Sequence, residues 1–196
     1  MKQLVSQAEL RALQAQIHPH FLFNALNTLY GIIPKEAAGA RRTVLNLADI
    51  FRYFLQTERR TIALEDEMRI VRSYLEIESL RLGPKLQIQL DLDPLALPAQ
   101  IPVLSVQPLV ENAVKHGVAP QAQGGLVRVT ARVTDGLMVL RVADTGAGFA
   151  HQSALEGAGV GLNNVRRRLQ LCYQGKADLV MERNGEETVV GFSAPL

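Results

Sequence analysis

The segment with the clearest capacity for chemistry is QIHPHFLFNALN, residues 16–27. A stripe at alternating three- and four-residue spacing runs through it and changes from apolar to polar, in the order Leu10, Leu13, Ile17, His20, Asn24 and Asn27. Polar groups on a packing stripe cost free energy unless they are paired or used. A neutral imidazole is a nucleophile, and its ordinary pKa of about 6.5 leaves it largely unprotonated at neutral pH. The stripe therefore predicts a chemically active surface around His20.

The two histidines of this segment are not equivalent. His18 and His20 are two residues apart, which places them about 200° apart around a helix, so they cannot form a metal clamp on one face. A histidine on a helix is most often structural, but His20 continues the stripe, whereas His18 is interpreted as a surface neighbour. Asn24 follows His20 by one turn and is expected to stand beside it. Phe21, not an acid, comes directly after His20, so the sequence names no base for it.

A second polar cluster lies in the segment PLVENAVKHG, residues 108–117. On a helix, Glu111 lies four residues before Lys115 and Asn112 four before His116, so these side chains share one face. The opposite face, which is expected to pack on a sheet, is formed by Leu109, Val110, Ala113 and Val114. A carboxylate, an amide oxygen and a lysine on one face suit work on a hard cation and phosphate. Taken alone, the four residues also fit a solvated face with a Glu–Lys pair.

Two glycine-rich segments favour the chemical interpretation of that cluster. Asp144 follows an apolar run at 137–142, and Gly146 and Gly148 after it allow the backbone to approach a ligand closely. The segment GAGVGLNN, residues 157–164, then opens a predicted helix, where free N–H groups and the positive end of the dipole face phosphate. A dinucleotide-binding βαβ unit is excluded, because no strand leads directly into this glycine run. The segments predict a nucleotide site.

The N-terminal part of the chain is expected to be helical. Apolar periodicity runs over residues 2–32, and Pro19 predicts a kink within it, because proline cannot donate to a carbonyl of the preceding turn. A second amphipathic helix is predicted over about 35–57, and the short connection favours an antiparallel hairpin. Broad apolar faces predict that the hairpin pairs with a second copy into a four-helix bundle, as a homodimer. We assign residues 1–62 to this domain.

The rest of the chain, residues 63–196, is predicted to form an α+β domain with helices over one face of a mixed sheet. A third helix starts near Leu64 and stops at Gly83-Pro84. Asp135-Gly136 is a hairpin signal between two strands. Alternating patterns predict strands over 86–92, 127–133, 137–142, 177–181 and 188–192. Two further helices are predicted over 104–116 and 160–173.

Composition restricts the function classes. The formal net charge is +2, which argues against nucleic acid or a membrane surface as a partner. Cys172 is the only cysteine, so an intrachain disulfide and a cysteine zinc site are excluded, as suits a reducing cytosol. No apolar run approaches the roughly 18–20 residues that span a bilayer, and the N-terminus lacks a signal-peptide pattern. The chain begins inside a helical pattern, as a fragment of a longer protein would.

The ordered motifs resemble those of sensor histidine kinases of the LytS/YehU type. The run PHFLFN, residues 19–24, resembles their H-box, and the segments around Asn112, Asp144 and Gly161 resemble the N, G1 and G2 boxes of the GHKL ATP-binding fold. The resemblance covers about residues 8–193. It implies a helical hairpin followed by a GHKL (Bergerat) α/β sandwich that uses ATP and Mg2+.

The resemblance also implies roles for matching positions. Glu111 corresponds to a general base or metal-orienting acid, Asn112 to the magnesium ligand, and Asp144 to the aspartate that accepts a hydrogen bond from the adenine amino group. Residues 151–157 would form a short lid over ATP. The other positions implied to contact the nucleotide are Lys115, His116, Gly146, Gly148, Gly159, Gly161, Leu162 and Asn164.

Three further positions bear on the resemblance. Thr145 stands where the G1 box usually has asparagine, a departure that the neighbouring aspartate and glycines make tolerable. Arg168 matches the Gly-Leu-x-Asn-Val-x-x-Arg-Leu ending of the G2 box. Arg81 also fits the family pattern, and a salt bridge is its default role.

The implied function is the cytoplasmic catalytic core of a two-component sensor histidine kinase, attached to a membrane only through an upstream sensor region. His20 would accept the γ-phosphoryl group of ATP and pass it to an aspartate on the receiver domain of a response regulator. Asn24 would orient water when that aspartyl phosphate is hydrolysed; the alternative is a buried amide pairing across the dimer. A degenerate dimeric scaffold and a regulator phosphatase with little kinase activity remain alternatives. A GHKL serine kinase of the anti-sigma type would lack His20.

Overall fold

The computed structural model describes residues 19–56, 60–146, 160–185 and 187–196. The chain divides into two compact units, Met1–Gln56 and Thr57–Leu196. None of the helices in the described ranges combines the length and apolar character needed to cross a membrane.

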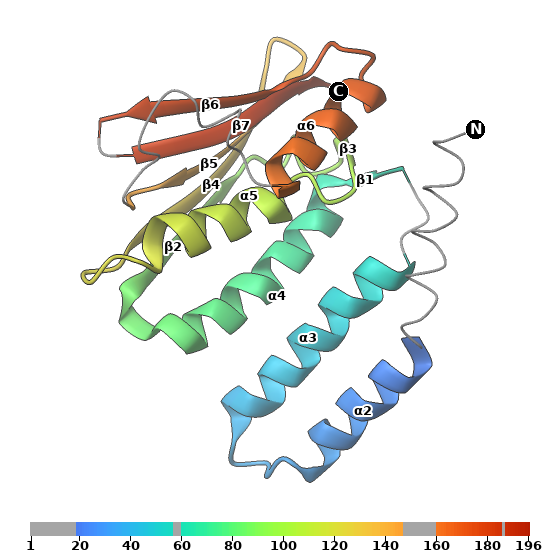
Figure 1. Cartoon of the computed structure of the whole chain (residues 1–196). Coiled ribbons are helices and arrows are strands. Elements are labelled where there is room, and N and C mark those ends of the chain that lie inside the picture. Colours follow the sequence, from blue (N-terminus) through green and yellow to red (C-terminus); the bar gives the residue numbers. More distant parts are fainter. Residues whose placement is uncertain (1–18, 57–59, 147–159, 186) are drawn as a thin grey trace. The chain divides into compact units, whose positions relative to one another are not determined.

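The first unit contains the predicted helical hairpin. Helix α2 spans Pro19–Ile32 and helix α3 spans Ala38–Gln56, joined by a short connection (Figure 1). Arg41 of α3 closes this connection: its Nη1 donates to the carbonyls of Tyr30 and Ile33, each at 2.9 Å, and its guanidinium lies 3.8 Å from the Tyr30 ring centroid. These contacts satisfy carbonyls that a helix end leaves without partners. The predicted stretch before Pro19 lies outside the described residues.

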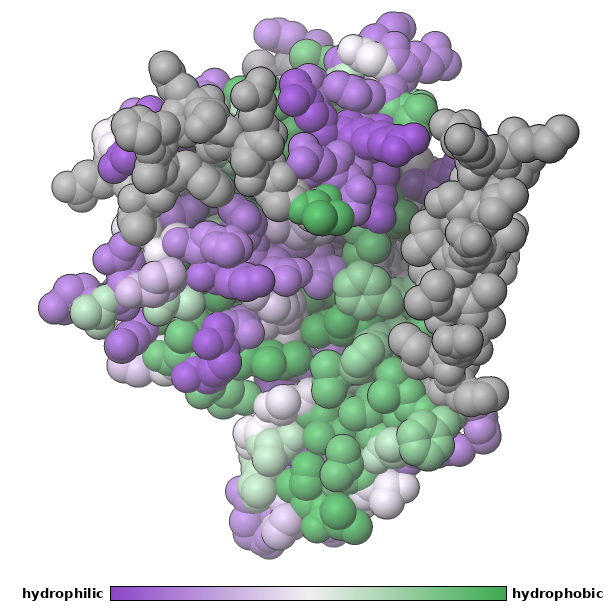
Figure 2. Space-filling model, viewed as in Figure 1, coloured by the Kyte–Doolittle hydropathy of each residue, from purple (hydrophilic) through white to green (hydrophobic). Residues whose placement is uncertain are grey.

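The hairpin leaves much of its apolar surface uncovered. Figure 2 shows hydrophobic side chains gathered over α2 and α3. Leu26 and Ile50 are buried in the unit, whereas Phe21 and Ile32 are 74% and 71% exposed. Two helices alone cannot enclose the broad apolar faces that the sequence pattern gives them. The other large apolar side chains exposed on the hairpin are Leu29, Leu45 and Phe54.

The second unit is an α/β sandwich (Figure 1). A five-stranded sheet has the order β2-β4-β5-β7-β6, in which β2 and β4 are parallel and the other pairs are antiparallel. Its strands are β2 (Leu86–Leu92), β4 (Gly125–Thr134), β5 (Leu137–Asp144), β6 (Leu179–Asn184) and β7 (Glu187–Pro195). Helices α4 (Leu64–Leu82), α5 (Gln107–Asn112) and α6 (Val160–Cys172) cover one face. The predicted mixed sheet with helices on one side is confirmed.

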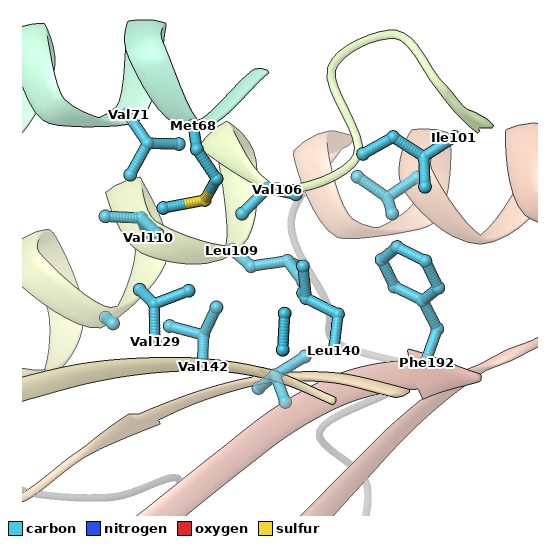
Figure 3. Close-up of a cluster of buried hydrophobic side chains, with 14 of the residues drawn as sticks. Met68, Val71, Ile101, Val106, Leu109, Val110, Val129, Leu140, Val142 and Phe192 are labelled. Carbon is cyan, nitrogen blue, oxygen red and sulfur yellow. The ribbon is translucent and has the colours of Figure 1, made fainter. Parts of the chain in front are cut away.

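The core lies between the three helices and the sheet (Figure 3). Alternate residues of β5, namely Met138, Leu140 and Val142, are buried on the helix-facing side. Phe192 of β7 completes this floor, and Leu109 of α5 packs down onto it. The helical layer adds Met68, Val71, Val106 and Val110.

Some features differ from the predicted pattern. A two-stranded sheet pairs β1 (Thr61–Ala63) with β3 (Gln100–Pro102), and such short strands carry no readable alternation. The predicted boundary between residues 62 and 63 falls inside β1. A 3-10 turn, η1 (Gly83–Lys85), ends α4.

The hairpin turn at Asp135-Gly136 is confirmed. Its two residues have φ values of 52° and 74°, as a turn with two left-handed residues requires.

Candidate functional site

The polar cluster at residues 108–117 lies on α5 and on the π-helical turn η2 (Ala113–Val118) that continues it. The widened turn is visible in the hydrogen bond from the Ala119 N–H to the Val114 carbonyl, 2.8 Å long. Glu111, Lys115 and His116 are exposed and Asn112 is half-buried. The predicted division into a polar and a buried apolar face is confirmed, but the π turn was not predicted. Such turns are frequent at functional sites. The buried face consists of Leu109, Val110, Ala113 and Val114.

Asp144 ends β5 as a buried carboxylate, only 5% exposed. Burial raises the pKa of Asp144 to about 6. The charge of Glu187 also raises this pKa, whereas a 3.0 Å hydrogen bond from the Gly146 N–H to Oδ1 of Asp144 acts in the opposite direction. A ligand that donates a further hydrogen bond to this carboxylate would favour its ionised form.

Two glycines allow the π turn to lie directly against Asp144. A Cβ at Gly117 would stand 2.2 Å from Oδ1 of Asp144, and a Cβ at Gly146 would stand 2.1 Å from the carbonyl carbon of Gly117. Neither position can accept a side chain without movement of the backbone or of Asp144. Sequence reasoning did not include Gly117 in the site, although a glycine directly after the polar cluster was the available signal. The N and G1 segments thus meet through backbone contact.

Thr188 is a second site residue that sequence reasoning missed. It is paired with Asp144 in the register of β5 and β7, so both side chains lie on the helix-facing side of the sheet. Thr188 is 3% exposed, and its hydroxyl has no hydrogen-bond partner among the described residues. A buried polar atom without a partner calls for a ligand or water. An acceptor carboxylate beside a hydroxyl matches the edge of adenine, which presents an amino donor next to ring-nitrogen acceptors.

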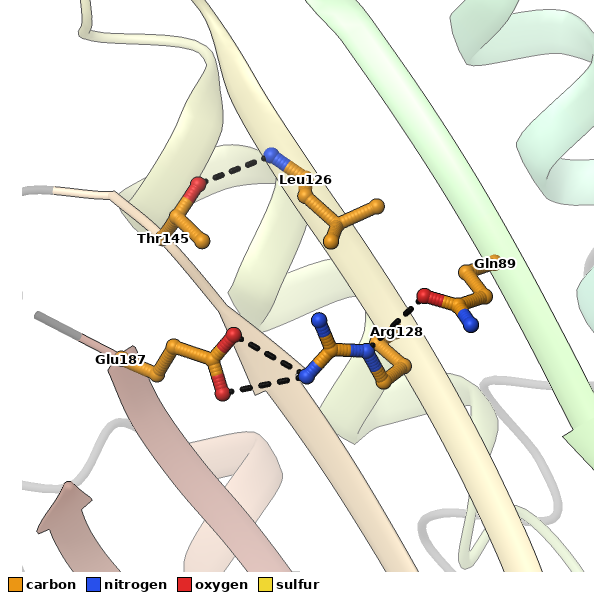
Figure 4. Close-up of polar contacts among 5 residues, drawn as sticks. All are labelled: Gln89, Leu126, Arg128, Thr145 and Glu187. Atoms are coloured by element: carbon orange, nitrogen blue, oxygen red, sulfur yellow. Dashed lines mark hydrogen bonds and ion pairs between the residues drawn. The ribbon is translucent and has the colours of Figure 1, made fainter.

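Thr145 connects the strand ends next to Asp144 (Figure 4). Its N–H donates to the Leu126 carbonyl at 3.1 Å, and its hydroxyl accepts the Leu126 N–H at 2.9 Å. Arg128 makes a second link across the sheet, donating to Glu187 at 3.0 Å and to Gln89 at 2.9 Å. These bonds hold the start of β4 and β7 beside the Asp144 turn. Thr145 therefore has a structural use where the resembled motif has asparagine.

The G2 segment is described only from Val160 onward. A Cβ at Gly161 would lie 4.0 Å from the Cβ of Pro108, so the starts of α6 and α5 are neighbours. Leu162 is 3% exposed with its side chain in the core, whereas Asn164 is exposed. The predicted positions that lie outside the described residues are Gly148, Gly159 and the lid at 151–157.

The predicted neighbours His20 and Asn24 meet in the first unit. Nδ2 of Asn24 lies 3.2 Å from Nδ1 of His20, within hydrogen-bond distance. His20 is exposed at the start of α2, so its ring is open to a reaction partner. His18 lies outside the described residues. The predicted site residues in the described ranges thus fall into an imidazole–amide pair on one unit and, on the other, the polar cluster, Asp144 and the start of α6.

The two arginines singled out in the sequence have different partners. Arg81 donates to the Glu78 carboxylate at 2.9 Å, the salt bridge expected by default. Arg168 instead donates to two main-chain carbonyls, those of Val103 at 3.1 Å and Leu104 at 3.2 Å. Within the described ranges, no three or more histidine, cysteine, aspartate or glutamate side chains are grouped so that they could hold a metal ion.

Comparison with known families gives two adjoining matches. Residues 8–86 match the family described as histidine kinase, and residues 102–196 match the family described as histidine kinase-, DNA gyrase B- and HSP90-like ATPase. The second match contains Asp144, Gly117 and Thr188, and the first contains His20 and Asn24. The ATPase match supports nucleotide binding by the α/β unit.

Solved structures of histidine kinases share the fold. The histidine kinase domain of the Erythrobacter litoralis blue-light-activated kinase EL346 aligns over 90% of this chain and 96% of that domain, with a TM-score of 0.56 at 20% identity. The Acinetobacter baumannii histidine kinase AdeS aligns over 91% of this chain and 95% of that chain, with a TM-score of 0.54 at 18% identity.

Curated relatives are sensor proteins. The chain is 33% identical to the sensor protein LytS of Staphylococcus saprophyticus over 98% of its own length and 34% of that protein. It is 36% identical to the sensor histidine kinase BtsS of Escherichia coli over 86% of its own length and 30% of that protein. The chain thus spans about a third of the length of these relatives. With its kinase and ATPase segments in this order, the chain belongs to the sensor histidine kinases of the LytS/YehU type.

Proposed function

We propose that this chain is the catalytic core of a two-component sensor histidine kinase, which transfers the γ-phosphoryl group of ATP to His20. The observation that carries the proposal is the Asp144–Thr188 pair. A buried carboxylate and a buried hydroxyl without a partner stand side by side, directly against the segment that carries Glu111 and Asn112. Adenine recognition and phosphate chemistry would therefore share one scaffold, in which positioning and charge neutralisation supply most of the catalysis.

The α/β unit would bind and orient the nucleotide. Ionised Asp144 accepts the adenine amino hydrogen, and the Thr188 hydroxyl bonds to the same edge of the base. Asn112 would hold Mg2+, Glu111 would orient the groups around the metal, and Lys115 would face the phosphates. Bound Mg2+ supplies neutralisation of charge on the β- and γ-phosphates. His116 and Asn164 are also exposed and available to the phosphate side.

His20 would act as the nucleophile through Nε2. The Nε2–P bond forms as the bond between the γ-phosphorus and the bridging oxygen breaks, and ADP leaves with that oxygen. The attacking ring must carry its proton on Nδ1. An Asn24 amide turned so that its oxygen faces the ring accepts this proton in a hydrogen bond and holds the tautomer. Asn24 thus assists His20 where Phe21 replaces an acid.

The phosphoryl group would then pass to an aspartate on a response-regulator receiver domain, and Asn24 would orient water when that aspartyl phosphate is hydrolysed. A homodimer is proposed because the hairpin exposes Phe21 and Ile32 at 74% and 71%. The upstream part of a longer protein would supply the signal and a membrane connection, with this core in the cytoplasm.

Incubation with γ-labelled ATP and Mg2+ tests the proposal. The expected label is acid-labile and base-stable, as phosphohistidine is, and is absent in His20→Gln. The Asp144→Asn variant should also lose labelling, because it weakens adenine binding. Label that persists in His20→Gln would refute the acceptor assignment. Nucleotide binding without any labelling of the wild type would instead identify a scaffold.

A further inference from the structure

A buried glutamate outside the predicted site holds the start of the helix that carries Glu111. Glu67 of α4 is 0% exposed, and its carboxylate accepts the backbone N–H groups of Leu104 at 2.9 Å, Val106 at 2.9 Å and Gln107 at 3.2 Å. A buried carboxylate is costly unless hydrogen bonds compensate it. Val106 stands at the N-cap position of α5, where its apolar side chain cannot accept a hydrogen bond. The Glu67 carboxylate takes the place of such a cap.

Arg168 of α6 holds the same loop through its carbonyls. Its Nη1 donates to Val103 at 3.1 Å and to Leu104 at 3.2 Å. Glu67 thus accepts the N–H of Leu104, and Arg168 donates to the carbonyl of the same residue. Leu104 has a φ of 57°, a left-handed conformation that is unfavourable for a residue other than glycine and persists only where neighbours hold it.

The loop connects two parts of the nucleotide site. Its C-terminal end runs directly into α5, so Glu111 follows Gln107 by one helical turn and Asn112 is the next residue. Arg168 belongs to α6, whose start carries the G2 residues Gly161 and Asn164. The loop therefore ties the helix behind the glycine segment to the helix of the N box.

We propose that Glu67 and Arg168 are positioning residues of phosphoryl transfer, which clamp the loop at residues 103–107 from two sides and so set the placement of Glu111 and Asn112. This inference rests on the proposed function, in which those two residues work on Mg2+ and phosphate. Helix α5 and the π turn that continues it begin at this loop, so the loop fixes the position of the first turn, which leads directly to Glu111 and Asn112. A displacement of about 1 Å at a reacting group can cost about 10²-fold in rate.

The clamp predicts a specific separation of effects. Asp144 and Thr188 lie on β5 and β7, and the helix that the loop begins meets Asp144 only at its far end, through Gly117. Loss of the clamp at the first turn should therefore leave adenine binding largely intact. Interactions that depend on Mg2+ and the γ-phosphate should be lost, because they depend on α5. A general loss of stability would instead weaken both together.

The decisive variant is Arg168→Met, which keeps the apolar stem and removes the donors. We expect phosphorylation of His20 to slow by at least about tenfold. The gain in affinity for AMPPNP on adding Mg2+ should also disappear, while the affinity for ADP in EDTA stays within about threefold of wild type. Arg168→Lys retains a donor and should recover part of the rate. Calorimetry measures the affinities, and γ-labelled ATP the rate.

Neighbouring arginines provide matched controls. Arg167 is exposed on the same helix, and Arg166 binds Asp178 at 2.9 Å away from the loop. Arg167→Met and Arg166→Met should leave the Mg2+-dependent gain intact. The proposal is wrong if Arg168→Met keeps that gain and the rate, or if ADP affinity falls in step with them.

Glu67→Gln is the second test. One carboxylate oxygen becomes an amide donor that cannot accept an N–H, so a folded variant should show the same separation of effects as Arg168→Met. If it does not fold, Arg168→Met decides the proposal. Failure of the proposed function would appear differently, as no labelling of wild-type His20; the Mg2+-dependent affinity would then still report on the clamp.

Discussion

At the residue scale, the most consequential group is a carboxylate placed where water cannot fully solvate it. Asp144 is 5% exposed, and burial raises its pKa to about 6. Binding of a donor amino group favours the ionised form, whereas folding without nucleotide favours the protonated one. The same side chain therefore links nucleotide binding and stability to pH, with opposite signs.

Nucleotide affinity should fall as the pH falls through 6. A protonated Asp144 cannot accept from the adenine amino group in the same way, so ADP affinity in EDTA should decrease about tenfold between pH 8 and pH 5. Calorimetry at several pH values measures this decrease. The Asp144→Asn variant lacks the titrating carboxyl group, so its affinity changes with pH only through other groups such as those of the nucleotide. The prediction fails if the ADP affinity of this variant changes with pH as that of the wild type does.

Stability without nucleotide should show the opposite response. The folded-state pKa of about 6 lies above the ordinary value of 3.8, so the folded protein holds this proton more tightly. The contribution of Asp144 to the unfolding free energy therefore decreases as the pH rises from about 4 to 6 and stays low above that range. Asp144→Asn should raise the unfolding free energy at pH 8 by about 1–3 kcal/mol, and much less at pH 4.5. Denaturant titration at both pH values tests this; an equal effect at both would contradict it.

Asn24 should matter for phosphorylation as well as for dephosphorylation. Asn24→Leu removes the side-chain amide that lies 3.2 Å from Nδ1 of His20, and it should lower the rate of phosphorylation at least about tenfold. Asn24→Asp supplies a carboxylate for the same proton and should retain the rate. Labelling kinetics distinguish the two. Intact hydrolysis of the regulator phosphate in Asn24→Ala would exclude the water-orienting role.

At the element scale, the site depends on an irregular helix. The π turn η2 brings Gly117 against Asp144, while α5 before it carries Glu111 and Asn112. A regular helix would change the phase of every residue after Asn112 by part of a turn. The contact between the π turn and the Gly146 turn thus joins the far end of the N segment to Asp144.

Gly117→Ala should disrupt this contact. Its Cβ would lie 2.2 Å from Oδ1 of Asp144, and such overpacking costs about 1–3 kcal/mol. We expect ADP affinity to fall at least about tenfold, measured by calorimetry. Gly31→Ala on α2, where a Cβ meets nothing within 4 Å, is the control and should leave affinity unchanged. Wild-type affinity in Gly117→Ala would show that the turn can yield.

At the scale of the whole molecule, the proposed function is divided between two units. The first carries the imidazole–amide pair and the second the residues proposed to bind the nucleotide. The first unit also exposes more apolar surface than a hairpin can enclose, as Phe21 and Ile32 show. Such surface on a helical pair indicates a partner, and we propose a second copy of this chain.

The dimer should be sensitive to charge on this face. Ile32→Glu and Phe54→Glu would bury an unpaired carboxylate in the interface, which is strongly unfavourable. We expect the dissociation constant from analytical ultracentrifugation to rise at least about tenfold. Leu80→Glu, at a 57% exposed position of the second unit, is the control. A dimer unaffected by both hairpin variants would place the interface elsewhere.

Local patterns were sufficient for most of the fold. Helical periodicity predicted α3 and α4, and alternation with Asp135-Gly136 predicted β4, β5 and their turn, because these signals depend on residues close in the chain. The short strands β1 and β3 escaped prediction, since three residues show no period. The π turn also escaped prediction, because its contact with the Asp144 turn joins residues that are far apart in the sequence.

The sequence by itself determined the chemical groups: His20 on its stripe, the Glu111–Asn112 face, Asp144 at a strand end and the glycines after it. Only the tertiary structure decided that Gly117 and Thr188 border Asp144, and that Glu67 and Arg168 hold the loop before α5. Those contacts join residues as far apart as Glu67 and Gln107, or Arg168 and Val103. Residue type and local spacing carry no information on such pairs, because they form only when helices and strands pack.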